Sequence, residues 1–320
     1  MKITGSVLVH TNELDKIWID ECVKLGIPRI GIHPVGGLSA DKSLADLIAH
    51  LETEEYRKIL DYAAECGLEV EYEMHAARYL LPASEFDVHP DWFRMNENGE
   101  RVTDINFCVT NEAALDYVAK KAAETAKKLY RSTNRYFFWM DDKHNGECHC
   151  PKCSKYSISD QQLIVANRIV RELRKDNPNA MVAYLAYFEC VETPKLVKPE
   201  DGIFLEYAPY KRNMHLPLCV DDEKNNHENK CLKELLEYFG ADTAKVLDYW
   251  LDNSLFSAYK KPPKLLNEDK AVVAADFPYY IDLGFKDITT FACYLGWDYR
   301  ELYGMPDIMG YANALRKANE

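Results

Sequence analysis

Arg135-Tyr-Phe-Phe-Trp-Met-Asp-Asp-Lys-His-Asn-Gly-Glu-Cys-His-Cys-Pro-Lys-Cys153 is the stretch of this chain that says most about its fold. It begins as a short aromatic run of the kind that forms a buried strand. The run ends in two adjacent carboxylates, Asp141 and Asp142, and a polar turn with three cysteines follows. If the strand belongs to a barrel, its carboxyl end is where catalytic groups sit.

The rest of the chain alternates strand-like and helix-like segments. Short apolar or alternating runs predict eight strands, at residues 3–9, 28–33, 68–75, 135–140, 181–188, 202–207, 245–251 and 287–295. Apolar residues at helical spacing predict helices from Asn12 to Leu25 and at residues 54–66, 111–130, 160–175, 230–239 and 268–283, with a closing helix from 305 onward.

This alternation, with short connections from helix to strand, predicts parallel strands. We therefore expect an α/β fold, a (β/α)₈ TIM barrel forming a single domain over residues 1–320. The irregular passage after the third strand, around residues 82–99, predicts an insertion over one face of the barrel. A doubly wound open sheet is the alternative, but no Gly-x-Gly-x-x-Gly follows the first strand.

Composition limits the classes of partner. The net charge of −13 argues against nucleic acid and against an anionic membrane surface, and no segment is apolar enough to span a bilayer. The N-terminus lacks the pattern of a signal peptide, and the 10 cysteines show no extracellular framework. These features predict a reduced, cytoplasmic protein, or a secreted one if the sequence has been trimmed.

In such a barrel the carboxyl ends of the strands converge on one pocket. The residues at these ends are rich in carboxylates, aromatic rings and histidines, which favours the chemistry of glycosidic bonds and a carbohydrate substrate. His33 and His75 are interpreted as ligands of sugar hydroxyls, with a metal pair alongside Glu73 and His10 as the alternative. Trp297 is the candidate stacking platform, although an ordinary core tryptophan explains it nearly as well. The predicted substrate-binding residues are His33, His75, Glu206, Tyr210, Arg212, Tyr249, Asp252 and Trp297.

Asp141 and Asp142 are the predicted catalytic residues. Two adjacent carboxylates repel, so one of them should hold its proton nearer neutral pH. A sequence-adjacent pair suits substrate-assisted, retaining hydrolysis, in which the substrate's own 2-acetamido oxygen attacks the anomeric carbon. Asp141 would then orient the acetamide and Asp142 would protonate the leaving oxygen. Adjacent strand residues point to opposite faces, so both reach the pocket only if the chain twists there.

Two other functions remain open. In the first, Asp142 works as the acid with Glu206 or Asp252 across the site, as in glycosidases with two separate carboxylates. In the second, the barrel binds carbohydrate without catalysis. Arg212, if it lines the pocket, would indicate an acidic sugar.

Several motifs together carry a resemblance to a known family: Ile32-His33-Pro34, Glu147-Cys-His-Cys-Pro-Lys-Cys153, Tyr207-Ala-Pro209 and Asp248-Tyr249-Trp250. With these the chain resembles a domain-of-unknown-function family of barrel proteins related to glycoside hydrolase family 20, some of whose members are classed as glycoside hydrolase family 163. The resemblance implies hydrolysis of an N-acetylhexosamine linkage. Family 20 carries Asp-Glu after the fourth strand, whereas this chain has Asp-Asp, which leaves the division of roles open.

Cys148, Cys150 and Cys153 have two interpretations. Thiolates at this spacing bind zinc, and His144, His149 or Cys190 would supply the fourth ligand. Alternatively, the cysteines pack at the rim of the barrel, or form a disulfide if the protein is exported. The predicted reaction itself requires no cofactor.

Overall fold

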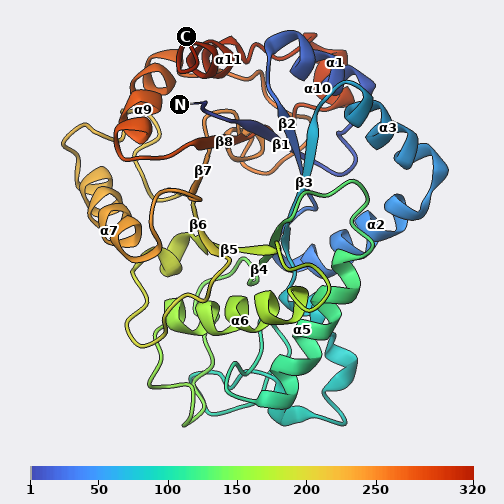
Figure 1. Ribbon diagram of the computed structural model, residues 1–320, viewed down its shortest axis with the longest axis vertical. Helices are drawn as coiled ribbons and strands as arrows, with labels where there is room; N and C mark the ends of the chain where they lie inside the picture. Colours follow the sequence, from blue (N-terminus) through green and yellow to red (C-terminus); the bar gives the residue numbers. More distant parts are fainter. Residues whose placement is uncertain (1) are drawn as a thin grey trace.

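The computed structural model describes residues 2–320 and forms a closed barrel of eight parallel strands in sequence order (Figure 1). The strands are β1 (Ser6–His10), β2 (Arg29–His33), β3 (Glu69–His75), β4 (Arg135–Trp139), β5 (Met181–Ala186), β6 (Ile203–Tyr207), β7 (Lys245–Asp248) and β8 (Asp287–Phe291). β1 pairs with both β2 and β8, which closes the barrel. The predicted (β/α)₈ barrel is therefore confirmed.

Helices surround the strands (Figure 1). The main ones are α1 (Lys16–Leu25), α2 (Ala40–Glu52), α3 (Glu54–Glu65), α5 (Glu112–Ala126), α6 (Ile158–Leu173), α7 (Glu223–Phe239), α9 (Lys270–Asp282) and α11 (Met309–Lys317). Short helices lie in the connections: α4 (Ala77–Leu80), α8 (Asn253–Phe256) and α10 (Trp297–Tyr303), with the 3₁₀ turns η1 (Gly37–Ser39), η2 (Ala83–Glu85), η3 (Pro90–Trp92) and η4 (Phe188–Val191).

Side-chain caps explain where most of these helices begin. Asn111 caps α5 as predicted, whereas α1 is capped by Asp15 and not at Asn12, and so begins later than expected. α7 begins at Glu223, before the predicted residue 230, because Asp222 caps a polar first turn. α2 was not predicted. It follows a 3₁₀ turn and Ser39 makes no capping hydrogen bond, so the usual start signal is missing even though Leu44, Leu47 and Leu51 are buried at helical spacing.

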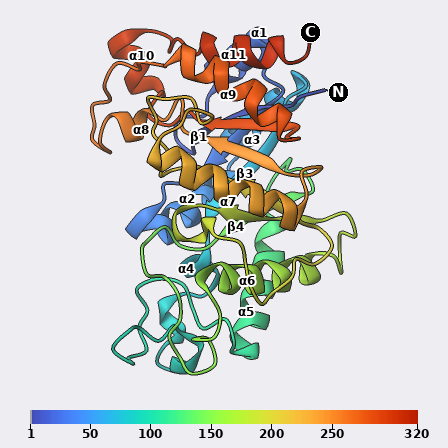
Figure 2. The same cartoon turned by 90° about the vertical axis from the view of Figure 1, so that its left-hand side faces the viewer.

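The predicted insertion after β3 is also confirmed. Residues 76–111, called the insertion below, contain α4, two 3₁₀ turns and a small antiparallel bridge between Met95 and Arg101. The insertion lies beside the loop that joins β4 to α6, residues 140–157, called the β4 loop. Both views place these segments together at the lower end of the molecule (Figures 1 and 2).

Candidate active site

A cavity of about 350 Å³, called the mouth cavity, lies at the carboxyl ends of the barrel strands. Its residues come from the ends of all eight strands, which is the convergence that a parallel barrel dictates. The polar and aromatic residues that line it are His10, His33, His75, Trp139, Asp142, Tyr187, Tyr210, Tyr249, Asp252, Ser254, Tyr259, Phe291, Cys293 and Tyr294.

Three histidines at the ends of β1, β2 and β3 form a row along one wall of this cavity. The Nδ1 atoms of His10, His33 and His75 lie 3.0, 2.7 and 2.6 Å from the backbone carbonyls of His33, Glu73 and Met140. A carbonyl only accepts, so each Nδ1 is the donor of its hydrogen bond, an arrangement that leaves Nε2 as the acceptor of a neutral imidazole. Burial, together with the neighbouring histidines, lowers the pKa of His33 well below its usual value. The row therefore offers acceptors suited to hydroxyl protons.

The alternative interpretation, a metal pair alongside Glu73 and His10, loses Glu73 as a ligand. The Glu73 side chain turns into the barrel interior, where it contacts Lys245. Within residues 2–320, the groups of ligand atoms close enough to share a metal do not include these histidines.

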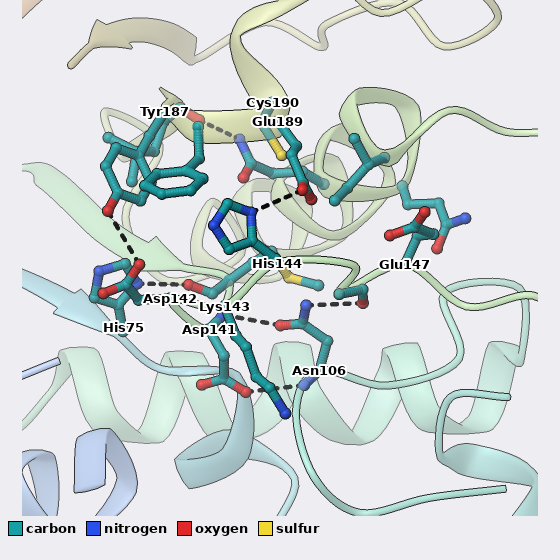
Figure 3. A pocket seen from close by; sticks show the side chains of 17 residues that line it. His75, Asn106, Asp141, Asp142, Lys143, His144, Glu147, Tyr187, Glu189 and Cys190 are labelled. Carbon is teal, nitrogen blue, oxygen red and sulfur yellow. Dashed lines mark hydrogen bonds and ion pairs between the residues drawn. The ribbon is translucent and has the colours of Figure 1, made fainter. Parts of the chain in front are cut away.

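Asp142 is the carboxylate of the adjacent pair that lines the mouth cavity. The Tyr187 hydroxyl donates a hydrogen bond to its Oδ1 over 3.1 Å, and Tyr187 comes from the end of β5. A Cβ added at Gly36 would lie 3.6 Å from Asp142 Oδ2 and 3.0 Å from His75, so this glycine keeps space beside the carboxylate. Asp142 also lines a second cavity of about 250 Å³, called the outer cavity, together with His75, Leu185 and Tyr187 (Figure 3).

Asp141 points away from Asp142, toward the insertion (Figure 3). Asp141 and Asn106 form a reciprocal pair: each backbone N–H donates to the other's side-chain oxygen over 2.8 Å. The Arg78 guanidinium lies 3.4 Å from Oδ2, and Oδ1 has no hydrogen-bond partner. Burial raises the pKa of Asp141, opposed by the Asn106 amide and by Arg78. The raised pKa of Asp141 is therefore caused mainly by burial, and not by the predicted repulsion between two neighbouring carboxylates.

Asp252 follows β7 and lines the mouth cavity. Its Oδ1 caps α8 by accepting from the backbone N–H groups of Ser254 and Leu255 and from the Ser254 hydroxyl. Burial raises the pKa of Asp252, while these hydrogen bonds oppose the rise. A carboxyl of this kind keeps its proton to a higher pH than an exposed aspartate.

Aromatic rings form much of the remaining wall. The Tyr210 and Tyr259 hydroxyls lie 3.3 Å apart, and the Tyr249 and Phe291 rings stack with centroids 5.1 Å apart. Trp139 ends β4 and packs against His75, with ring centroids 5.1 Å apart. The strand alternation that points Phe137 inward also points Trp139 inward, so the sequence did contain a signal for it.

Five of the predicted substrate-binding residues line the mouth cavity, and three do not. His33, His75, Tyr210, Tyr249 and Asp252 are the five. Trp297, expected as a stacking platform, begins α10 and is 58% exposed outside the cavity. Arg212 forms buried ion pairs with Asp248 and Asp276, at 2.8 and 2.7 Å, instead of facing the mouth.

Glu206 is the third correction. It is fully buried below the mouth, where its Oε2 accepts from Trp139 Nε1 over 2.8 Å and Oε1 lies 3.3 Å from Lys245 Nζ. Burial raises the pKa of Glu206 well above its usual value, with Lys245 opposing the rise and Glu73 adding to it. It belongs to a set of charged side chains inside the barrel, called the interior network: Arg29, Glu71, Glu73, Arg135, Glu206, Lys245 and Asp287.

The cysteines of the β4 loop lie close to a fourth cysteine, Cys108, which their spacing in the sequence does not indicate. The thiols of Cys148, Cys150 and Cys153 meet that of Cys108 from the insertion, and the four sulfur atoms lie within 4.8 Å of one another. All ten cysteines are free thiols. The expected fourth partners, His144, His149 and Cys190, lie elsewhere; His144, for example, contacts Glu189 at 2.9 Å.

Comparison with known proteins agrees with this architecture. The structure of a β-galactosidase from Rahnella sp. R3 is similar over 98% of this chain and 55% of its own, with a TM-score of 0.60 and 12% identity. A β-galactosidase from the psychrophilic Marinomonas ef1 gives a TM-score of 0.56 and 13% identity over 90% of this chain and 54% of its own. The chain thus spans about half the length of these two enzymes.

A third similar structure shows the GH20 catalytic modules of the pneumococcal exo-β-D-N-acetylglucosaminidase StrH, with a TM-score of 0.51 and 9% identity over 98% of this chain and 83% of that one. At such identities the likeness establishes the barrel fold. Comparison with curated protein sequences gave no match. No helix within residues 2–320 is long and apolar enough to cross a membrane.

The fold and the site together define the class of this protein: a parallel (β/α)₈ barrel with carboxylates at the ends of its strands. More narrowly, the chain belongs to the family described as Domain of unknown function (DUF4838), which matches residues 49–254.

Proposed function

We propose that this protein is a glycoside hydrolase whose reaction takes place in the mouth cavity, with Asp142 and Asp252 as its two carboxylates. The observation that carries the proposal is that both side chains line one cavity at the carboxyl ends of the strands. Hydrolysis of a glycosidic bond needs one carboxyl group to protonate the leaving oxygen and a second to stabilise or attack the anomeric carbon.

The surroundings of the two groups assign their roles. Asp252 is buried with a raised pKa, which suits a general acid that must hold its proton until the bond breaks. Asp142 accepts a hydrogen bond from the Tyr187 hydroxyl on Oδ1, and Gly36 leaves space beside its Oδ2 for an incoming group. Asp142 is therefore the nucleophile or base, and Asp252 donates its proton to the departing oxygen.

The lining of the cavity favours an uncharged sugar. Among the described residues around the mouth cavity none is Lys or Arg, and Arg212 is held by two buried carboxylates. The histidine row and the tyrosine hydroxyls match the hydroxyl groups of a neutral ring, and the aromatic faces match its apolar surface. The acidic sugar suggested by Arg212 loses its support.

The position of Asp142 between two cavities indicates how a longer substrate lies. The mouth and outer cavities share His75, Asp142, Leu185 and Tyr187. A substrate longer than one ring would extend from the mouth cavity past Asp142 into the outer cavity, beside His144 and Glu189.

A second candidate is substrate-assisted hydrolysis of an N-acetylhexosamine linkage at Asp141 and Asp142. It is favoured by one observation: Asp141 borders the outer cavity and its buried Oδ1 has no hydrogen-bond partner. An acetamide N–H would reach this oxygen only after the Asp141 side chain turned from Asn106 toward the cavity. The relation to glycoside hydrolase family 20, which motivates this candidate, stays a prediction.

The test is a panel of nitrophenyl and dinitrophenyl glycosides, including β-galactosides, β-glucosides and β-N-acetylglucosaminides. Asp142→Asn and Asp252→Asn should each lower kcat by about 10²- to 10⁴-fold on nitrophenyl substrates. On dinitrophenyl substrates, whose leaving group needs no proton, only Asp142→Asn should stay slow. Asp242→Asn, at a side chain 94% exposed on the surface, is the matched control and should keep full activity.

The same panel separates the alternatives. An N-acetyl-thiazoline inhibitor that binds tightly, and more weakly to Asp141→Asn, would favour the substrate-assisted candidate. Full turnover by folded Asp142→Asn would refute both catalytic proposals. Calorimetric binding of a glycan without product from any substrate would indicate a carbohydrate-binding barrel instead.

A further inference from the structure

The four thiols of Cys108, Cys148, Cys150 and Cys153, called the cysteine cluster, lie close together around one point. Their sulfur atoms all lie within 4.8 Å of one another, and Cys108 Sγ lies 3.7 Å from Cys150 Sγ and 3.8 Å from Cys153 Sγ. Four sulfur ligands at about 2.3 Å from a tetrahedral zinc ion stand about 3.8 Å apart. A disulfide would instead require a separation of about 2.05 Å. We propose that the cysteine cluster binds one zinc ion.

Hydrogen-bond donors face the sulfur atoms, as thiolate ligands require. The Met95 N–H donates to Cys148 Sγ over 3.3 Å, and the Arg101 guanidinium lies 4.0 Å from the same sulfur. The Thr110 hydroxyl lies 3.1 Å from Cys153 Sγ. Packing of neutral thiols would call for apolar neighbours at these positions. A cation such as Arg101 fits better beside a zinc tetrathiolate, whose net charge is negative.

The backbone of the β4 loop is bent around the cluster. The N–H groups of Cys153 and Ser154 both donate to the Cys150 carbonyl over 2.9 Å, which turns the Cys150–Cys153 segment tightly. This turn brings two sulfur atoms from a Cys-x-x-Cys segment to one point, the local geometry common to structural zinc sites. Because all four positions are filled by protein sulfur, the ion has no open position for substrate and serves a structural role.

The consequence is a link between the insertion and the β4 loop. Cys108 belongs to the insertion, and the other three ligands belong to the β4 loop, so the ion would join the two segments that lie together in Figure 2. Cys108 follows closely after Asn106, the partner of Asp141 in the reciprocal hydrogen-bonded pair. The zinc ion would therefore hold the loop that carries Asp141 and Asp142.

Metal analysis of the full chain, purified without added zinc, tests the proposal directly. One zinc per chain is expected, falling at least fivefold in Cys108→Ser. Cys190→Ser is the matched control, because Cys190 is also buried but lies outside the cluster, and it should keep its zinc. Wild-type protein without stoichiometric metal, or with iron in place of zinc, would overturn the proposal, as would full zinc retention by Cys108→Ser.

A second measurement covers the case in which Cys108→Ser does not fold. Cobalt exchanged into the wild-type protein should give the intense sulfur-to-metal absorption of four thiolate ligands in a tetrahedral field. On removal of zinc by a chelator, amide exchange should speed up in residues 94–108 and 141–153 and stay unchanged in β1 and β2. Cobalt absorption indicating fewer than three thiolates, or unchanged exchange in both segments, would refute the assignment.

Discussion

Replacing Lys245 with methionine should leave the barrel interior with more negative charge than its cations balance. The Lys245 ammonium is fully buried and contacts Glu73, and it lies 3.3 Å from Glu206 and 3.7 Å from Glu71. The interior network contains three cations and four carboxyl groups. Burial raises the pKa of Glu206 well above its usual value, so loss of the Lys245 charge favours proton uptake by this network.

The magnitude follows from the proton that the variant must take up. Without Lys245, one more buried glutamate has to be neutral in the folded protein, while in the unfolded chain it ionises near its reference pKa of about 4.3. At pH 7 this costs about 2.7 × 1.36, or roughly 3.7 kcal/mol, of the free energy of unfolding. The estimate lies within the range of about 3–5 kcal/mol for removing one partner of a buried ion pair.

Urea unfolding followed by circular dichroism measures this loss. With an unfolding entropy of about 0.7 kcal/mol per kelvin for 320 residues, the melting temperature should also fall by roughly 4–7 °C. The cost is absent below the unfolded pKa and grows as the pH rises above it, so at pH 5 it should shrink to about 1 kcal/mol. Lys286→Met, which removes an exposed partner of Asp242, should cost less than about 1 kcal/mol. A loss for Lys245→Met below 1 kcal/mol at pH 7, or one that does not shrink at pH 5, would refute the reasoning.

Three further predictions concern the proposed reaction. Because burial raises the pKa of Asp252, activity should fall as the pH rises through that value, and Asp252→Asn should abolish this alkaline limb of the pH–rate profile. Tyr187→Phe removes a hydrogen-bond donor from Asp142, and a hydrogen bond to a carboxylate contributes about 1.5 kcal/mol, so kcat/KM should fall about tenfold. Gly36→Val places atoms against His75 and should raise KM about tenfold with an unchanged melting temperature. An alkaline limb that persists in Asp252→Asn, an unchanged kcat/KM in Tyr187→Phe, or a normal KM in Gly36→Val would contradict the respective assignment.

The fold was accessible from the sequence because strand and helix signals are local. Each strand is a short apolar run, and caps such as Asn111 or stops such as Gly26 mark where helices begin and end. α2 was not predicted because its first turn carries no capping hydrogen bond. The seven residues of the interior network depend instead on how neighbouring strands are aligned. Glu206 and Lys245 are partners across β6 and β7, and that register cannot be read from either strand alone.

In the candidate site, too, some residues could be predicted from the sequence and others depend on the tertiary structure. The ends of the strands predicted His33, His75 and Asp252 in one cavity because a parallel barrel brings such ends together. Trp297 lies at the start of α10, outside the mouth cavity, and the spacing of residues after β8 does not show which of them face the cavity. Cys108 lies 40 residues before Cys148, in an irregular insertion, so only the tertiary structure brings the two thiols together.

The opposite orientations of Asp141 and Asp142 connect the chemistry to the architecture. Both residues lie in the β4 loop just after β4 ends at Trp139, where one carboxylate faces the mouth and the other faces the insertion. The hydrogen bonds of Asp141 to Asn106 fix the backbone from which Asp142 projects, and the cysteine cluster fixes the segment that carries Asn106. The two proposals therefore stay separable: Asp142→Asn should lose turnover and keep its zinc, whereas Cys108→Ser should lose its zinc and keep the barrel. Loss of zinc from Asp142→Asn would mean that the carboxylate itself holds the β4 loop together, and its effect on turnover would then say nothing about catalysis.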